Sequence, residues 1–154
     1  MRELPKRVYV ESSVVSGMFD SNDHPKRVKP FWDAVFSGKI RVILSDVLEG
    51  EVNDAPPHVR EFFKSIPKSQ VERIEATEES DALASQYVLA GITSEGSLTD
   101  CRHVALAAVA GVDVLVSFNC DHIVKLNRIV RYNAINVLHG YPTIEIRTPD
   151  EVLP

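Results

Sequence analysis

Several acid and amide side chains lie where enzymes often keep catalytic groups. They are Glu11, Glu51, Asp100, Asn119 and Asp121. Carboxylates brought close together raise one another's pKa and repel each other unless a cation lies between them. Oxygen ligands of this kind suit Mg²⁺ or Mn²⁺, and a metal ion that they hold lowers the pKa of a bound water and contacts phosphate oxygens. Since single acids are mostly solvated surface charges, a metal site is expected only where the fold gathers them.

Two of these positions follow short β-rich runs. Glu11 closes the first such run, and Asn119 comes shortly after the run 112–116. Parallel sheets hold active sites at the carboxyl ends of their strands, so both side chains are expected at one edge of a sheet. Asp100 opens the helix predicted over 97–111, where the helix dipole favours a negative charge. We expect Asp100 to face the polar residues that follow the next strand.

Strands and helices alternate along the chain. Runs of β-branched and apolar residues predict strands over 7–11, 39–44, 70–74, 112–116 and 134–138. Apolar residues at helical spacing predict helices over 12–19, 25–37, 46–55, 57–65, 77–91 and 97–111. The segment 123–129 fits either a short helix or a loop. This alternation predicts an α/β fold with a parallel sheet covered by helices on both faces.

Length and composition bound the class of protein. A chain of 154 residues that is 44% apolar and 25% charged predicts a single globular domain over residues 1–154. No apolar run approaches the ~20 residues that span a bilayer, no signal peptide is visible, and two cysteines form no disulfide framework. A cytoplasmic protein without membrane contact is therefore expected. The net charge of −5 argues against a protein that coats nucleic acid, but allows an enzyme that meets phosphate through a metal ion.

The acids and their neighbours resemble the motifs of the PIN-domain family, and in particular of VapC-type toxin ribonucleases from toxin–antitoxin systems. The resemblance extends over residues 8–149. The family's first strand ends in an acid followed by a hydroxyl residue, which matches Glu11 and Ser12. Its second acid lies inside a helix that a serine opens, which matches Glu51 rather than Glu49. The likeness therefore assigns the first two acids of the site.

The third family acid leads an alanine-rich helix, as Asp100 does. The fourth follows a strand-ending hydroxyl residue, so Ser117 points to Asn119. The resemblance implies a three-layer α/β/α sandwich with a central, mainly parallel sheet, which agrees with the alternation of strands and helices.

The function that the resemblance implies is hydrolysis of RNA phosphodiesters by an endoribonuclease that depends on Mg²⁺ or Mn²⁺. The implied catalytic residues are Glu11, Glu51, Asp100 and Asn119, with Ser12 and Ser117 in support. The implied metal ligands are Glu11, Glu51 and Asp100, with Asp121 near enough to take the place of Asn119. The family also implies an antitoxin protein as partner and a homodimer.

Two positions depart from the family pattern. Glu11 stands where the family has Asp, and its extra methylene moves the carboxylate outward by roughly 1.5 Å, more than the ~0.2 Å tolerance of metal–ligand distances. Asn119 keeps an oxygen donor but lacks the charge of an acid. Glu11→Asp is therefore expected to increase activity. The departures also leave a second interpretation open, a catalytically weak or inactive PIN-like domain that binds RNA or a protein partner.

A row of basic residues lies just after the expected site. Lys125, Arg128 and Arg131 recur at every third position and fit contacts with RNA phosphates. A solvated basic face of a helix gives the same pattern, so both interpretations stay open.

Two other classes of site are disfavoured by the sequence. The Cys-x-His pairs at 101–103 and 120–122 lack the spacing of zinc ligands, so Cys101 is expected to pack as an apolar residue and His103 to make a structural hydrogen bond. A phosphatase or receiver domain would need an Asp nucleophile at the end of a central strand. The residues at those strand ends do not supply one.

Overall fold

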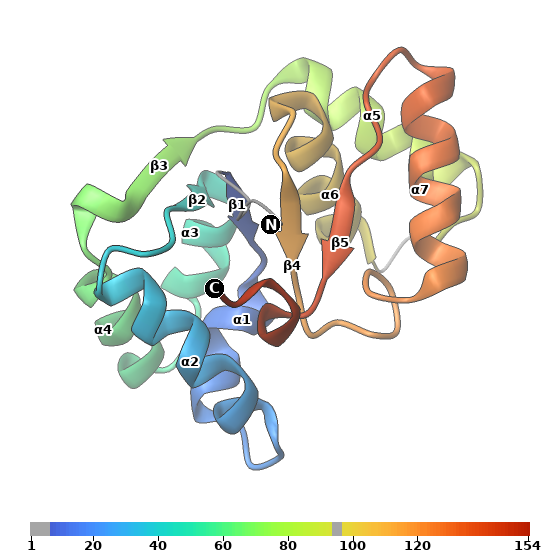
Figure 1. Ribbon diagram of the computed structural model, residues 1–154. Helices are drawn as coiled ribbons and strands as arrows, with labels where there is room; N and C mark the ends of the chain where they lie inside the picture. The colour runs from blue at the N-terminus through green and yellow to red at the C-terminus, as the bar shows by residue number, and fades with distance from the viewer. Residues whose placement is uncertain (1–6, 94–96) are drawn as a thin grey trace.

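The computed structural model describes residues 7–93 and 97–154 of the chain. At its centre lies a five-stranded sheet with the order β3-β2-β1-β4-β5, in which every neighbouring pair runs parallel. The strands are β1 (Val8–Val10), β2 (Val42–Ser45), β3 (Val71–Ile74), β4 (Val114–Val116) and β5 (Glu145–Arg147). The predicted parallel sheet is confirmed (Figure 1).

Helices connect the strands and cover both faces of the sheet (Figure 1). In the described part of the chain they are α1 (Ser12–Ser16), α2 (His24–Phe36), α3 (Asp46–Asn53), α4 (Pro57–Ser65), α5 (Glu78–Leu89), α6 (Leu98–Ala110) and α7 (Leu126–Leu138). Short 3₁₀ turns lie at Gly17–Phe19, Lys68–Gln70 and Pro149–Val152. Parallel strands need such crossovers, because the chain must return to the same end of the sheet before it can pair again.

Alternating side chains of the strands divide the apolar core into two layers. In β1, Val8 and Val10 face one layer, where they join Phe31 and Trp32 of α2. Tyr9 points to the opposite face, into the layer formed with α5, α6 and α7. Because successive residues of a strand point to opposite faces, a buried run such as β1 serves both layers. The predicted three-layer α/β/α sandwich is confirmed.

The predicted strand over 134–138 is wrong, because this segment lies within α7. The fifth strand of the sheet is β5, which pairs with β4. Polar contacts hold the helix in place: buried Asn136 accepts a hydrogen bond from Tyr87 of α5, and Asn133 bonds both backbone groups of Ile144 at 2.9 Å and 2.8 Å. The β-branched residues of the segment gave a strand pattern, but tertiary contacts at helical spacing decided its structure.

Local signals in the sequence fix several helix ends. Ser45 Oγ accepts the backbone N–H of Leu48 at 3.1 Å and caps α3. Thr77 and Ser80 form a capping box at the start of α5. Gly111 ends α6 with a φ of +64°, in the left-handed region that glycine enters without strain. These ends hold α3 and α6, the helices that deliver acids to the site described below.

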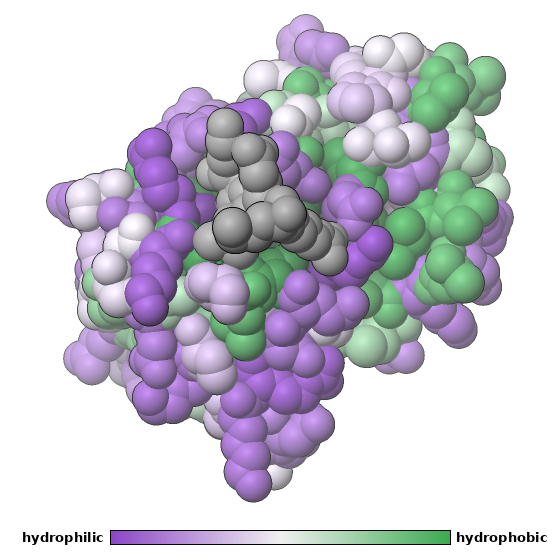
Figure 2. Space-filling model, in the orientation of Figure 1, coloured by the Kyte–Doolittle hydropathy of each residue, from purple (hydrophilic) through white to green (hydrophobic). Residues whose placement is uncertain are grey.

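The molecular surface is mostly hydrophilic on the face shown in Figure 2, with apolar surface concentrated on the side where α7 lies. The large apolar side chains that α7 exposes are Leu126, Val130, Val137 and Leu138. Within residues 7–93 and 97–154, no helix is both long enough and apolar enough to cross a membrane.

Candidate active site

Parallel strands deliver polar residues to one edge of the sheet. Val8 of β1 pairs with Val42 of β2 and with Val114 of β4, so these three strands lie side by side in register. Glu11 directly follows β1, and Ser117 directly follows β4. Both residues are therefore at the carboxyl edge of the sheet, where parallel α/β folds place ligands and substrates.

The Glu11 carboxylate is enclosed by serine hydroxyls, and the residue is only 3% exposed. Its Oε1 accepts hydrogen bonds from Ser13 Oγ and, at 2.6 Å, from Ser117 Oγ. Its Oε2 accepts a hydrogen bond from Ser12 Oγ at 2.7 Å. We call Ser12, Ser13 and Ser117 the serine cradle. Ser13 Oγ also accepts the backbone N–H of Phe118 at 2.8 Å, which ties α1 to the chain after β4. Such donors compensate a buried carboxylate for the water that it loses.

The Glu51 carboxylate reaches the same place from α3. Its Oε2 lies 3.1 Å from Ser12 Oγ, the hydroxyl that also bonds to Glu11. Its Oε1 lies 2.5 Å from Nε2 of His103, a fully buried residue of α6. One serine hydroxyl therefore lies between two carboxylates, and the 35% exposure of the Glu51 side chain leaves this pair open to solvent on one side.

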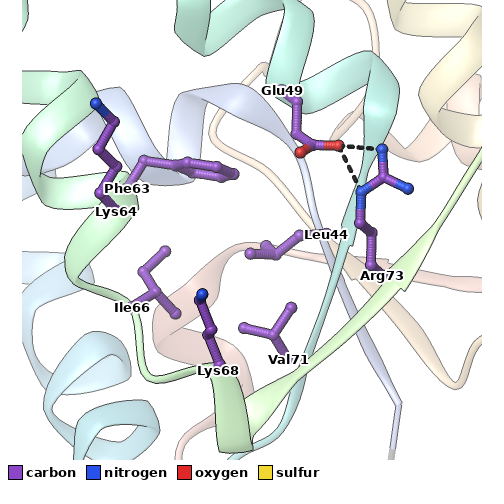
Figure 3. A pocket seen from close by; sticks show the side chains of 8 residues that line it. All are labelled: Leu44, Glu49, Phe63, Lys64, Ile66, Lys68, Val71 and Arg73. Carbon is purple, nitrogen blue, oxygen red and sulfur yellow. Dashed lines mark hydrogen bonds and ion pairs between the residues drawn. The ribbon is translucent and has the colours of Figure 1, made fainter.

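Glu49, on the same helix, points elsewhere. Its Oε1 lies 2.8 Å from Nε and 2.7 Å from Nη2 of Arg73. The two residues line a pocket of about 380 Å³ whose other walls come from α4, β2 and β3 (Figure 3). The structure thus separates the two glutamates of α3, and it is Glu51 that shares a hydrogen-bond partner with Glu11.

Asp100 brings a third carboxylate to this edge from the first turn of α6. Burial raises the pKa of Asp100 above its ordinary value, and the charge of Glu11 raises it further. Nearby His122 and His103, and the side-chain amide of Asn119, lower the pKa of Asp100 in part. The Asp100 carboxylate therefore lies within electrostatic range of Glu11 and near the side chain of Asn119.

Asn119 and Asp121 both follow β4 but lie differently. Asn119 accepts the backbone N–H of His122 on Oδ1 at 3.1 Å and donates its backbone N–H to Ser117 Oγ at 2.9 Å, and its side chain lies near Asp100. Asp121 is exposed, and in the described part of the chain it makes no hydrogen bond or ion pair with the other acids. Asn119 is thus part of the cluster, whereas a metal-ligand role for Asp121 stays a prediction.

The basic residues expected to contact RNA lie at the start of α7. Lys125 occupies the N-cap position and is exposed. Arg128 is partly buried, and its Nε has no hydrogen-bond partner among the described residues. Arg131 donates from Nη2 to the carbonyls of Ala90 and Gly91, at 3.2 Å and 3.0 Å, just after α5. The guanidinium of Arg131 is therefore already engaged in holding two helices together.

The donor chemistry of the cluster fits a hard divalent cation. Glu11, Glu51 and Asp100 offer carboxylate oxygens, and within residues 7–93 and 97–154 none of them forms an ion pair with lysine or arginine. Mg²⁺ and Mn²⁺ take oxygen ligands of this kind. Across the same residues, no group of three His, Cys, Asp or Glu side chains stands close enough to hold a metal ion as arranged here.

Three residues of the site escaped assignment from the sequence. They are Ser13, Tyr9 and His103. Sequence pattern assigns no site role to Ser13 or Tyr9, and for His103 it predicts only a structural hydrogen bond. Helical spacing held a signal for His103, which lies three residues after Asp100 and so on the same face of α6. Tyr9 gave no local signal, because its 2.7 Å contact with Nδ1 of His103 joins residues far apart in the sequence.

The expectation for Cys101 is confirmed. The residue is fully buried, with its thiol 3.1 Å from Oγ1 of Thr93, whereas Cys120 is exposed. Burial raises the pKa of the Cys101 thiol above its ordinary value. A buried protonated thiol packs as a small apolar group.

The fold matches those of solved VapC toxins. The structure is similar to VapC20 from Mycobacterium tuberculosis, a toxin that cleaves the sarcin–ricin loop, with a TM-score of 0.58 and 15% identity over 89% of this chain and 98% of that chain. It is also similar to VapBC2 from Rickettsia felis bound to a DNA fragment from its promoter, with a TM-score of 0.58 and 10% identity over 92% of this chain and 98% of that chain. No protein-family model and no curated protein sequence matches the chain. At these identities the likeness establishes the fold, which is that of VapC-like PIN domains.

Proposed function

We propose that this chain is a metal-dependent endoribonuclease and the toxin of a toxin–antitoxin pair. The observation that carries the proposal is the gathering of Glu11, Glu51 and Asp100 at the carboxyl edge of the sheet, without a lysine or arginine partner among the described residues. A cluster of carboxylates left without basic partners is unfavourable unless a cation occupies it. The shared fold of two solved VapC toxins supports the same assignment.

Each residue of the cluster has a distinct task in this proposal. Glu11, Glu51 and Asp100 would hold Mg²⁺ or Mn²⁺, with Asn119 completing the set. The ion, when bound, supplies a water of lowered pKa and positive charge for the phosphate. The serine cradle fixes the direction of the Glu11 carboxylate, and the side chain of Asn119 lies beside Asp100. Lys125 and Arg128, at the start of α7, are the proposed contacts to RNA phosphates.

The proposal includes protein partners. VapBC2 is a solved toxin–antitoxin complex with the same fold, and by analogy we infer that a small antitoxin protein binds this chain. A homodimer and a cytoplasmic location complete the proposal by the same analogy. Sedimentation velocity on the purified chain tests the dimer, which is expected to sediment as a species of twice the 17.1 kDa chain mass.

A second function, binding without cleavage, is favoured by two observations. Both oxygens of Glu11 are already bonded to serine hydroxyls, and an amide replaces the fourth acid. A PIN-like domain with such a site could recognise RNA or a protein through the same edge of the sheet. Failure to bind divalent metal would favour this alternative.

The test is cleavage of a mixed, partly structured RNA by the purified chain in Mn²⁺, beside a lane with EDTA. Asp100→Asn removes one charge of the cluster, and Glu49→Gln removes a charge from the same helix as Glu51 but outside the cluster. We expect cleavage by the wild type and by Glu49→Gln, and none with EDTA or in Asp100→Asn. Cleavage that survives EDTA would refute the metal-dependent mechanism, and a wild type without cleavage would favour the binding function.

A further inference from the structure

We propose that His103 is a positioning residue of the candidate active site. Tyr9 holds the imidazole in the form that carries its hydrogen on Nε2, and this N–H fixes one oxygen of the Glu51 carboxylate. This inference rests on the proposed function in one respect, because the proposed function assigns Glu51 to a metal site.

A series of short contacts links four residues from β1, β2, α3 and α6. Ser45 Oγ lies 2.9 Å from the hydroxyl of Tyr9. That hydroxyl lies 2.7 Å from Nδ1 of His103, and Nε2 of His103 lies 2.5 Å from Oε1 of Glu51. Ser45, Tyr9 and His103 have no exposed surface. We call these four residues the Ser45–Glu51 network.

The direction of the hydrogen bonds follows from counting hydrogens. The backbone N–H of Leu48 donates to Ser45 Oγ at 3.1 Å, so the hydroxyl hydrogen of Ser45 must point elsewhere. Among the described residues the other partner of Ser45 Oγ is the Tyr9 hydroxyl, so Ser45 donates to Tyr9. The hydrogen of Tyr9 then goes to Nδ1 of His103, and that nitrogen must be unprotonated.

The opposite direction leaves a buried hydrogen without an acceptor. If Nδ1 of His103 donated to Tyr9, then Tyr9 would donate to Ser45, and the Ser45 hydroxyl hydrogen would have no partner in a position closed to water. Buried polar groups of native proteins are rarely left unsatisfied. Burial also raises the pKa of Tyr9, which keeps its hydroxyl protonated and able to donate. The hydrogen-bond geometry therefore leaves Nδ1 of His103 as an acceptor and directs the Nε2–H to Glu51.

This arrangement gives the two oxygens of Glu51 different surroundings. His103 binds Oε1 from the protein interior, while Oε2 faces Ser12 and, beyond it, Glu11. A histidine held on both ring nitrogens keeps one tautomer and one orientation, and outer partners of this kind hold metal ligands in place. His103 thus directs Oε2 of Glu51 toward the other acids.

The first test is the tautomer of His103, measured by nitrogen NMR on the full chain with isotope-labelled histidine. The His103 signals are assigned by their loss in His103→Gln. We expect the ring hydrogen on Nε2 in the wild type and a mixture of tautomers in Tyr9→Phe. Tyr87→Phe is the matched control, because it removes the hydroxyl of another fully buried tyrosine, whose partner is Asn136, and it should leave the tautomer unchanged. A wild-type ring protonated on Nδ1 would overturn the proposal.

The second test is Mn²⁺ affinity, measured by isothermal titration calorimetry without RNA. Loss of an outer partner typically weakens metal binding by about 10- to 100-fold, and we expect this loss in Tyr9→Phe and His103→Gln but not in Tyr87→Phe. Far-UV circular dichroism of each variant establishes that it is folded. Equal Mn²⁺ affinity in folded Tyr9→Phe and wild type would show that His103 does not position Glu51.

A third measurement separates this inference from the proposed function. If the wild type binds no Mn²⁺, the metal-dependent mechanism fails, but the proton on Nε2 of His103 still reports its contact with Glu51. Its resonance is expected to move in Glu51→Ala and to stay in place in Glu49→Ala, a matched change on the same helix. A resonance that does not move in Glu51→Ala would refute the contact, whatever the metal result.

Discussion

Replacing Glu11 by Asp should lower the free energy of unfolding, because the shorter side chain withdraws from the serine cradle. The carboxylate now accepts hydrogen bonds at 2.7 Å from Ser12 and 2.6 Å from Ser117, and a further one from Ser13. Shortening the side chain by one methylene moves the oxygens back by roughly 1.5 Å, which carries these contacts beyond hydrogen-bond range unless the backbone shifts.

The magnitude follows from the charge and burial of the group. A hydrogen bond to a charged partner contributes about 1.5–3 kcal/mol, and Glu11 is only 3% exposed, so water does not replace a lost donor. With two of the three bonds lost after relaxation, we expect a fall of about 3 kcal/mol. For a chain of this length, that corresponds to a melting temperature lower by roughly 6 to 12 °C. Cleavage activity should fall as well, since the carboxylate loses its fixed direction.

The assay is thermal unfolding followed by circular dichroism, with RNA cleavage in Mn²⁺ measured on the same preparations. Glu49→Asp is the matched control, because it shortens a half-buried glutamate of the neighbouring helix α3, outside the serine cradle, and should change stability by less than about 0.5 kcal/mol. A Glu11→Asp variant with wild-type stability and higher activity would refute the reasoning. It would support the family-based expectation that Asp has the better reach.

Further outcomes follow from the same contacts. Asp100→Asn should reduce cleavage by more than about 100-fold, which exceeds the loss expected for a residue that only hydrogen-bonds to a metal ligand. The folded-state pKa of Asp100 is raised, so the ionised carboxylate destabilises the folded state. Asp100→Asn should therefore be at least as stable as the wild type at neutral pH, and the difference should vanish as the pH falls through the folded-state pKa of Asp100. Melting curves from about pH 8 to about pH 4 measure this difference. Lys125→Ala should weaken RNA binding and lower the salt dependence of binding by about 1 in filter-binding titrations. Arg131→Ala should change neither quantity, because Arg131 binds backbone carbonyls. Equal effects of the two substitutions would contradict the assignment of Lys125, and not Arg131, to RNA contact. Ser117→Ala should cost about 2 kcal/mol in urea unfolding through the lost bond to Glu11, and an unchanged midpoint would show that the cradle is not needed for stability.

The sequence determined the architecture and the edge of the sheet that carries Glu11 and Ser117. The β-rich runs before Glu11 and Ser117 are the strands β1 and β4, and the helix that begins near Asp100 ends at Gly111 as α6. These features are local, because side-chain periodicity and the glycines that end helices depend on only a few neighbouring residues. Together with the likeness to PIN domains, they were enough to predict the three-layer fold.

Local pattern failed where a segment's packing partners lie far away in the sequence. The run 134–138 has the composition of a strand, yet it forms the end of α7 because Asn133 and Asn136 meet Ile144 and Tyr87 at helical spacing. The strand position beside β4 is taken by β5 instead. Propensity is a weak preference, and tertiary contacts override it.

Only the tertiary structure decided which polar groups touch. The sequence alone offered two glutamates on α3, and the packing of that helix directs Glu49 to Arg73 and Glu51 to His103. The tertiary structure likewise turns Ser13 toward Glu11 and places Tyr9 against His103. Each of these contacts depends on the register of the sheet and the angle of a helix across it. Sequence spacing encodes the faces of single elements, but not the distance between side chains on different ones.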